Sequence, residues 1–216
     1  GEDALLELCR RLRAGKDYSD INNLWIKGKD GKITKNPLRE AADINKNPLP
    51  DFTMFEDARF YRPMAGRIYR MLPVETHRGC PFQCSYCNSP AQSRLYKSEG
   101  AGVFLRKRSI DKVREELEYY ISQYKAEYFY FWADTFFAYT DKEFNAFIEM
   151  YKDIKIPFWC QTRPETITEE RIKRLREVGL HRMALGIEHG NEKFRREIIN
   201  RRVKNEVIVN ALDIIS

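Results

Sequence analysis

From Ile68 to the end of the chain, short continuous apolar runs alternate with stripes of apolar residues at helical spacing. The continuous runs predict strands, at 72–76, 128–132, 156–160 and 183–187. The stripe at 109–125 predicts the clearest helix, because its apolar residues share one face behind Ser109, a good N-cap residue. Four βα units in succession imply an α/β fold with a parallel sheet and helices on its outer face. Strands this apolar are expected to be covered on both faces.

Further helix boundaries follow from local signals. Thr140 and Glu143 fit a capping box, and Thr168 can cap a helix that Gly179 closes. A short helix to about residue 199 and an apolar stripe in 205–216 complete the predicted elements.

The first part of the chain has a different pattern. Residues 4–14 have helical spacing, and 23–35 contain two alternating stretches around Lys-Asp-Gly, a hairpin signal. Proline-containing breaks follow this hairpin. We therefore expect residues 1–60 to form a helix–hairpin connector and residues 61–216 to form the βα part.

Composition excludes several classes of protein. Hydrophobic content of 43% indicates a globular chain with a core, and no apolar run is long enough for a membrane span. The net charge is +6, but the basic groups at 106–108, 195–196 and 201–202 are spread along the chain. We interpret them as solvated surface, so a nucleic acid partner is not expected. With no signal sequence and several clustered thiols, the chain is expected in the cytoplasm.

The candidate chemistry lies in one loop after the first predicted strand. Cys80, Cys84 and Cys87 have C-x3-C-x2-C spacing. Three thiolates can hold three irons of a cubane cluster and leave the fourth iron open to a cofactor or substrate. A zinc site is the alternative, with His77 as the nearby fourth ligand.

The remaining thiols argue against disulfides, and the position of the loop supports an iron–sulfur cluster. Cys9 and Cys160 are expected to be small buried hydrophobic residues, and five cysteines do not suggest a disulfide framework. In folds with parallel strands, ligands bind at the carboxyl ends of the strands, which is where this loop lies.

The spacing, with Arg-Gly before the first cysteine and an aromatic residue before the third, resembles the radical S-adenosylmethionine (SAM) enzymes. Segments 131–137 and 160–165 resemble the ends of the second and third strands of that family. Segment 186–191 resembles its fourth-strand G-x-E-S-G motif, with His189 in place of serine. The resemblance covers roughly residues 60–216 and implies a partial (β/α) barrel.

The resemblance also implies roles for individual residues. It assigns the [4Fe–4S] cluster to Cys80, Cys84 and Cys87. It places SAM beside further side chains: Tyr86 near the adenine, Asp134 at the methionine ammonium, Glu188 at a ribose hydroxyl, and Gln161 and Arg163 at cofactor or substrate.

The implied activity is reductive cleavage of SAM to a 5′-deoxyadenosyl radical, with a flavodoxin- or ferredoxin-like protein as the external one-electron reductant. The combination of segments is closest to the cobalamin-binding branch, in which a cobalamin domain precedes such a connector. Cobalamin, and with it methyl transfer or C–H functionalisation, is therefore expected only in a longer parent protein.

The predicted βα units are fewer than in the family's barrel, so we expect the chain to be a fragment. The incomplete barrel favours an alternative function, that of a non-catalytic iron–sulfur or zinc-binding accessory module. The three further segments that resemble the family, 131–137, 160–165 and 186–191, oppose that alternative. The sequence indicates neither the substrate nor the oligomeric state.

Overall fold

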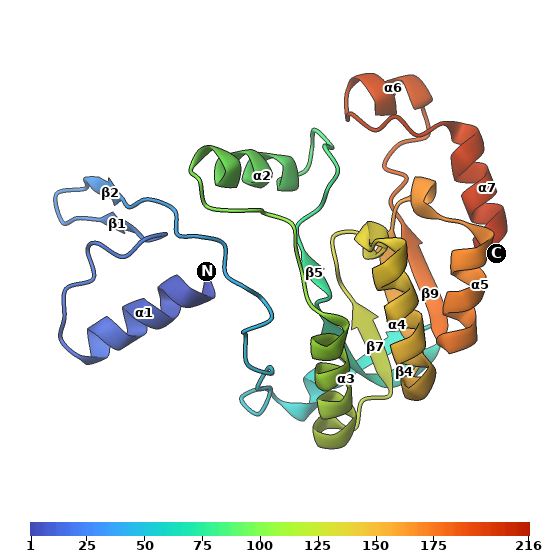
Figure 1. The fold of residues 1–216 in the computed structure, drawn as a ribbon, viewed down its shortest axis with the longest axis horizontal. Coiled ribbons are helices and arrows are strands. Elements are labelled where there is room, and N and C mark those ends of the chain that lie inside the picture. Colours follow the sequence, from blue (N-terminus) through green and yellow to red (C-terminus); the bar gives the residue numbers. More distant parts are fainter. The chain divides into compact units, whose positions relative to one another are not determined.

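A computed structural model describes residues 1–216. The chain forms two compact units (Figure 1). The first unit contains Gly1–Asp43 and Ala91–Phe104, and the second contains Ile44–Pro90 and Leu105–Ser216. The connector boundary expected near residue 60 stays a prediction.

The first unit confirms the predicted helix and hairpin. Helix α1 spans Glu2–Arg13, and strands β1 (Trp25–Lys27) and β2 (Ile33–Lys35) pair antiparallel. Most of α2 (Ser89–Ser98) also belongs to this unit, although the sequence pattern did not predict that helix.

The second unit is built on a five-stranded sheet with the order β3-β4-β7-β8-β9. Its strands are β3 (Tyr61–Met64), β4 (Arg67–Val74), β7 (Tyr128–Phe131), β8 (Phe158–Thr162) and β9 (Leu180–Leu185). The last four are parallel, and β3 is an antiparallel edge strand that the sequence pattern missed. The predicted partial barrel with four βα units is thus confirmed. A separate antiparallel pair joins β5 (His77–Arg78) to β6 (Arg106–Lys107).

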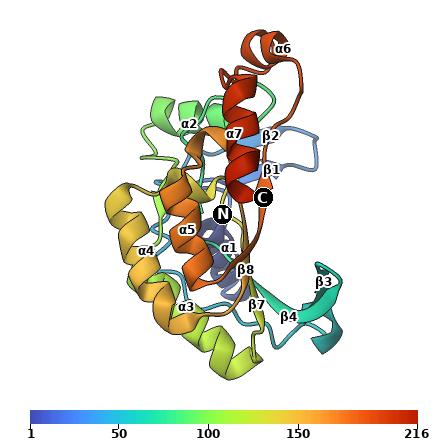
Figure 2. The same ribbon diagram turned by 90° about the vertical axis from the view of Figure 1, so that its right-hand side faces the viewer.

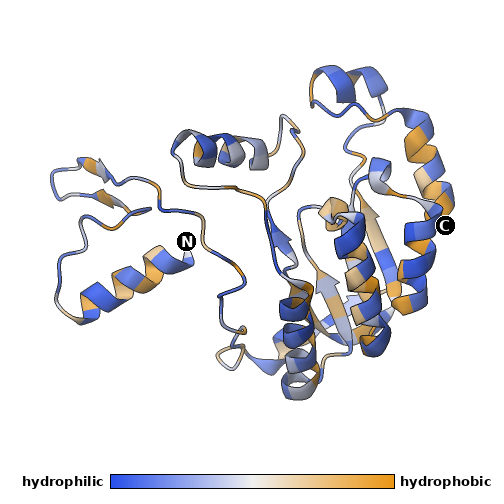
Figure 3. Cartoon of the chain, in the orientation of Figure 1, coloured by the Kyte–Doolittle hydropathy of each residue, from blue (hydrophilic) through white to orange (hydrophobic).

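Helices cover one face of this sheet. Figures 1 and 2 show three of them side by side: α3 (Ile110–Tyr124), α4 (Asp141–Ile154) and α5 (Glu169–Val178). Helices α6 (Glu192–Glu197) and α7 (Asn205–Ile215) follow β9, and short 3-10 turns lie at Asp57–Phe60, Phe136–Ala138 and Pro164–Thr166. Figure 3 shows hydrophobic and hydrophilic residues alternating along α4, α5 and α7, as expected of helices with one buried face.

The predicted caps are present. The Ser109 and Thr168 side chains accept backbone N–H groups of their helices, and Thr140 forms the full capping box with Glu143. Gly179 ends α5 with φ of +131°, and a Cβ there would lie 2.9 Å from the carbonyl oxygen of Ile156. Glycine is therefore required at this position.

The two faces of the sheet differ in burial. Toward the helices, Phe129, Phe131 and Phe158 are fully buried in an aromatic core. On the opposite face, Tyr130 and Trp159 stack with centroids 4.6 Å apart and are only half-buried. The expectation that both faces are covered is therefore met on the helix side and only in part on the other face, where Tyr128 is buried but Tyr130 and Trp159 are not. None of its helices combines the length and the apolar character needed to cross a membrane.

Candidate functional site

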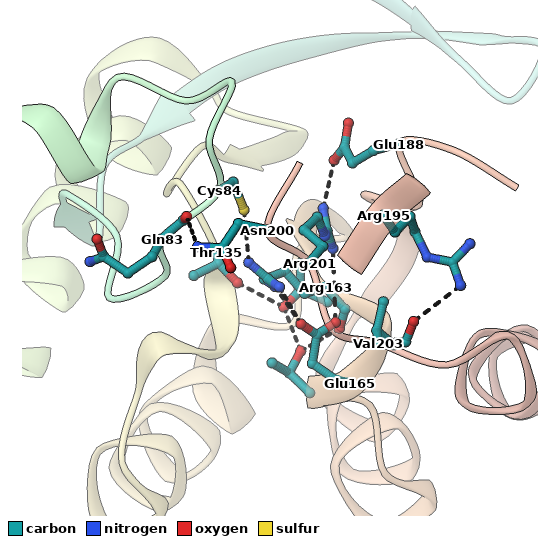
Figure 4. Close-up of polar contacts among 12 residues, drawn as sticks. Gln83, Cys84, Thr135, Arg163, Glu165, Glu188, Arg195, Asn200, Arg201 and Val203 are labelled. Atoms are coloured by element: carbon teal, nitrogen blue, oxygen red, sulfur yellow. Dashed lines mark hydrogen bonds and ion pairs between the residues drawn. The ribbon is translucent and has the colours of Figure 1, made fainter. Parts of the chain in front are cut away.

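The carboxyl ends of the four parallel strands carry nearly all of the predicted site residues. The cysteine loop follows β4 and β5, and Asp134 follows β7. Arg163 follows β8, and Glu188 follows β9. Hydrogen bonds join these ends. Gln161 Nε2 donates to the Ala133 carbonyl over 2.9 Å. Arg163 Nη1 donates to Cys84 Sγ over 3.1 Å (Figure 4).

The three cysteines differ in exposure. Cys84 is buried, Cys80 is half-buried and Cys87 is exposed. Two of the sulfurs accept an N–H group, which comes from Arg163 for Cys84 and from the Ser89 backbone for Cys87. Burial raises the pKa of the Cys80 thiol, and the Phe82 N–H opposes that effect. N–H donors aimed at cysteine sulfurs are the surroundings that iron–sulfur clusters use, so this donor set fits a cluster.

The zinc alternative required His77 as a fourth ligand. Its Nε2 lies 2.7 Å from the Thr135 carbonyl oxygen and its Nδ1 lies 3.1 Å from Thr76 Oγ1, so both ring nitrogens are engaged. Burial lowers the pKa of His77. No group of three or more His, Cys, Asp or Glu side chains is placed to hold a single metal ion.

The two remaining cysteines have different surroundings. Cys160 is fully buried in β8, as predicted, and burial raises its pKa. Cys9 is exposed on α1, so the prediction that it is buried was wrong.

Arg163 is held from three sides. It is 9% exposed, and its guanidinium carbon lies 3.7 Å from the centre of the Phe82 ring. Its Nε donates to Glu165 Oε1 over 2.6 Å, which leaves Nη1 directed at Cys84. A stacked, ion-paired arginine has little rotational freedom, so its contact with the sulfur is well defined.

Arg201 is a buried residue of the candidate site that sequence reasoning missed. The sequence pattern assigned it to solvated surface, but it is 2% exposed. Its Nη1 donates to Glu188 Oε1 over 2.7 Å, and its Nη2 lies 3.8 Å from Glu165 Oε2. Its Nε and Nη2 have no hydrogen-bond partner. A buried guanidinium with unused donors suits an anionic group such as a carboxylate.

The backbone at Glu188 is unusual. Its φ is +68°, a left-handed conformation that is uncommon in residues other than glycine and is found at functional sites. Two residues earlier, a Cβ on Gly186 would lie 2.6 Å from Glu188 Oε1 and 3.2 Å from Arg201 Nη1. Glycine at 186 therefore leaves space for this ion pair, which explains the G-x-E spacing.

Other predicted residues lie at the margin of the site. The Tyr86 hydroxyl is 3.5 Å from Arg201 Nη1, and burial raises its pKa to about 12, while the ring stays 55% exposed. Asp134 is exposed, and its charge acts on both Cys80 and His77. His189 packs on Phe194 at 4.4 Å and accepts a backbone N–H from Asn191, so it stabilises the start of α6.

The segment 198–201, which we call the clasp, binds the middle of the cysteine loop. Ser85 donates through its N–H to the Ile199 carbonyl over 3.1 Å and through its hydroxyl to the Ile198 carbonyl over 2.6 Å. The Asn200 side chain donates to the Gln83 carbonyl over 2.7 Å (Figure 4). The loop is thus bonded to residues more than a hundred positions away.

A second buried arginine supports the clasp. Arg195 is fully buried and donates to the carbonyls of His189 and Val203 and to the side chain of Asn205. These hydrogen bonds connect α6 to the residue His189 before it and to the beginning of α7. Arg195 was also assigned to solvated surface from the sequence, and this was wrong because the side chain is fully buried, with Nη1 and Nη2 bonded to oxygen atoms of the protein.

Comparison with known proteins agrees with this geometry. The radical SAM superfamily profile matches residues 74–216. An uncharacterized methyltransferase of Pyrococcus horikoshii is 25% identical over 98% of this chain and 44% of its own length. An anaerobic magnesium-protoporphyrin IX monomethyl ester cyclase of Rubrivivax gelatinosus is 26% identical over 100% of this chain and 38% of its own length.

Two solved structures share the fold. The cobalamin-dependent SAM radical enzyme OxsB aligns with a TM-score of 0.71 at 18% identity, over 98% of this chain and 30% of that one. The radical SAM methyltransferase TsrM of Kitasatospora setae aligns with a TM-score of 0.72 at 15% identity, over 99% and 42%. The chain therefore spans less than half of each of these relatives. With the family's profile matched from β4 to the last residue, the chain belongs to the radical SAM superfamily.

Proposed function

We propose that this chain is the cofactor-binding part of a radical SAM enzyme, in which Cys80, Cys84 and Cys87 hold a [4Fe–4S] cluster. The observation that carries the proposal is the set of three cysteines in one loop at the carboxyl ends of the parallel strands, with N–H donors on the sulfurs of Cys84 and Cys87. Iron–sulfur clusters bind through cysteine thiolates, and the missing fourth cysteine leaves a coordination position for SAM.

The side chains around the loop suit the polar parts of SAM. Arg201 offers unused, buried N–H donors to the methionine carboxylate. Asp134 provides a carboxylate near Cys80 for the methionine ammonium. Glu188, held by Arg201, and Gln161 at the end of β8 provide acceptors and donors for the ribose hydroxyls. Tyr86 offers an aromatic ring, largely exposed, against which the adenine can pack.

When bound, the cluster and SAM supply one-electron cleavage of the sulfonium, which yields a 5′-deoxyadenosyl radical. This chain's residues orient the two cofactors: the clasp fixes the cysteine loop, and the Glu188–Arg201 pair fixes the direction of the bound amino acid. The electron comes from an external flavodoxin- or ferredoxin-like protein. A fixed orientation limits side reactions of such a reactive species.

For the longer protein we propose a cobalamin-dependent reaction, either methyl transfer to carbon or another C–H functionalisation. The support is the match to the P. horikoshii methyltransferase and the fold shared with cobalamin-dependent enzymes. We place cobalamin in a domain that precedes the connector.

The test is production of 5′-deoxyadenosine from SAM by the iron-loaded protein under anaerobic, reducing conditions. We expect the product from the wild-type protein and none from Cys84→Ala. The matched control is Cys160→Ala, which removes a buried thiol outside the loop. A stable cluster without any 5′-deoxyadenosine, in the longer protein as well, would favour the accessory-module alternative.

A further inference from the structure

We infer that Arg163 is a positioning residue that raises the reduction potential of the cluster through its N–H bond and charge at Cys84. This inference rests on the proposed function. It concerns how readily the cluster accepts an electron, which the family assignment leaves open.

The geometry directs one donor of Arg163 at the sulfur. Nη1 lies 3.1 Å from Cys84 Sγ, while Nε and Nη2 both face Glu165 Oε1. The Phe82 ring packs against the guanidinium plane, with the guanidinium carbon 3.7 Å from its centroid. Because Phe82 lies between Cys80 and Cys84 in the sequence, the loop that carries the sulfurs also holds the arginine in place.

Burial makes this contact effective. Cys84 is 7% exposed and Arg163 is 9% exposed, so water screens their interaction weakly. Neither of the other two cysteines has a charged donor on its sulfur, and the donor to Cys87 is the backbone N–H of Ser89. Cys84 is therefore the ligand through which a charged side chain can change the reduction potential of the cluster.

The direction of the effect follows from charge. On reduction, the cluster gains one electron from the flavodoxin- or ferredoxin-like donor, which is oxidised by one electron, and no proton is transferred. The added negative charge is spread over the irons and sulfurs. A nearby cation and a hydrogen bond to a cysteine sulfur stabilise the reduced state more than the oxidised state. Arg163 should therefore make reduction easier.

The experiment is an EPR-monitored redox titration of the iron-loaded protein without SAM, comparing wild type with Arg163→Met. We expect the variant to have an equilibrium constant for reduction about tenfold lower, which is a potential about 59 mV more negative. Arg171→Met is the matched control. Arg171 is also paired with a carboxylate and packed on aromatic rings, but it lies on α5 without contact to the cysteines. We expect its potential to equal that of wild type.

A second variant distinguishes an effect on the potential from a folding defect. In Arg163→Met the Glu165 carboxylate loses its partner, so the double variant Arg163→Met with Glu165→Gln removes both charges. We expect the same direction of shift in the double variant. An unchanged potential in either variant with full iron content would overturn the inference. Loss of iron from both variants would also overturn it, because Arg163 would then be needed for assembly of the cluster. A wild-type cluster that forms but ignores SAM would instead count against the proposed function.

Discussion

The side-chain amide of Asn200 donates to the backbone carbonyl of Gln83 over 2.7 Å, across 117 positions of sequence. Gln83 is the residue immediately before Cys84, so this bond ties the cysteine loop to the segment that also carries Arg201. Asn200 has φ of +52°, a left-handed conformation that asparagine adopts more readily than most residues. One residue thus provides both the turn and the hydrogen bond.

Replacing Asn200 should loosen the cysteine loop. Asn200→Gly keeps the left-handed backbone and removes only the hydrogen bond, so we expect about 1 kcal/mol lower stability to unfolding. Asn200→Ala adds backbone strain and should cost more. In both variants the cluster should lose iron to a chelator several-fold faster than in wild type, measured anaerobically by absorbance. Equal iron loss in all three proteins would show that the clasp does not hold the loop.

Removing Arg201 should weaken SAM binding. Loss of a charge-assisted hydrogen bond costs about 1.5–3 kcal/mol, which corresponds to roughly 10- to 150-fold weaker affinity. Anaerobic calorimetry of iron-loaded Arg201→Met measures this change. Arg202→Met is the control, because its side chain is exposed and next in sequence. Similar SAM affinities for both variants would show that Arg201 does not bind SAM.

The buried His77 should give a specific pH dependence. Burial lowers its pKa in the folded state below the ordinary value of about 6.5, so below that pH the unfolded chain binds the proton more readily. Its contribution to stability is therefore complete above about pH 6.5 and is lost as the pH falls toward the lowered folded value. In chemical denaturation between pH 7.5 and 5, wild type should lose more stability than His77→Gln. An equal loss of stability in the two proteins over this pH range would show that His77 does not cause the pH dependence.

The aromatic core should dominate the stability of the second unit. Phe131 is fully buried against Phe147 and Phe158, with ring centroids 5.5 and 5.2 Å away, so Phe131→Ala should cost about 3–5 kcal/mol. Ile68→Ala on β4 is the control, because Ile68 is 66% exposed and should change stability by less than about 0.5 kcal/mol. Urea denaturation of both variants measures the difference.

Local patterns were sufficient for most of the second unit. The parallel strands, the capped helices and the cysteine loop follow from apolar periodicity, capping residues and spacing, which are short-range signals. The edge strand β3 was missed because it has few apolar residues and pairs through its backbone. Helix α2 was missed because its apolar stripe is weak.

The site was predicted less completely than the fold. Glu188 and the cysteines carry motif spacing, whereas the role of Arg201 depends on a hydrogen bond to Glu188 and on burial, which no local pattern encodes. Basic pairs in a sequence are typical of solvated surface, and here two of them each contain one buried arginine, Arg195 and Arg201. The contact between Arg163 and Cys84 joins residues 79 positions apart and required the fold.

The central claim is that the three cysteines hold a cluster with an open iron. The most direct measurement is anaerobic reconstitution with iron and sulfide, followed by iron counting and EPR of the reduced protein with and without SAM. We predict about four irons per chain and a signal that changes when SAM is added. Uptake of zinc without any iron–sulfur cluster, or a cluster signal that SAM leaves unchanged, would contradict the claim.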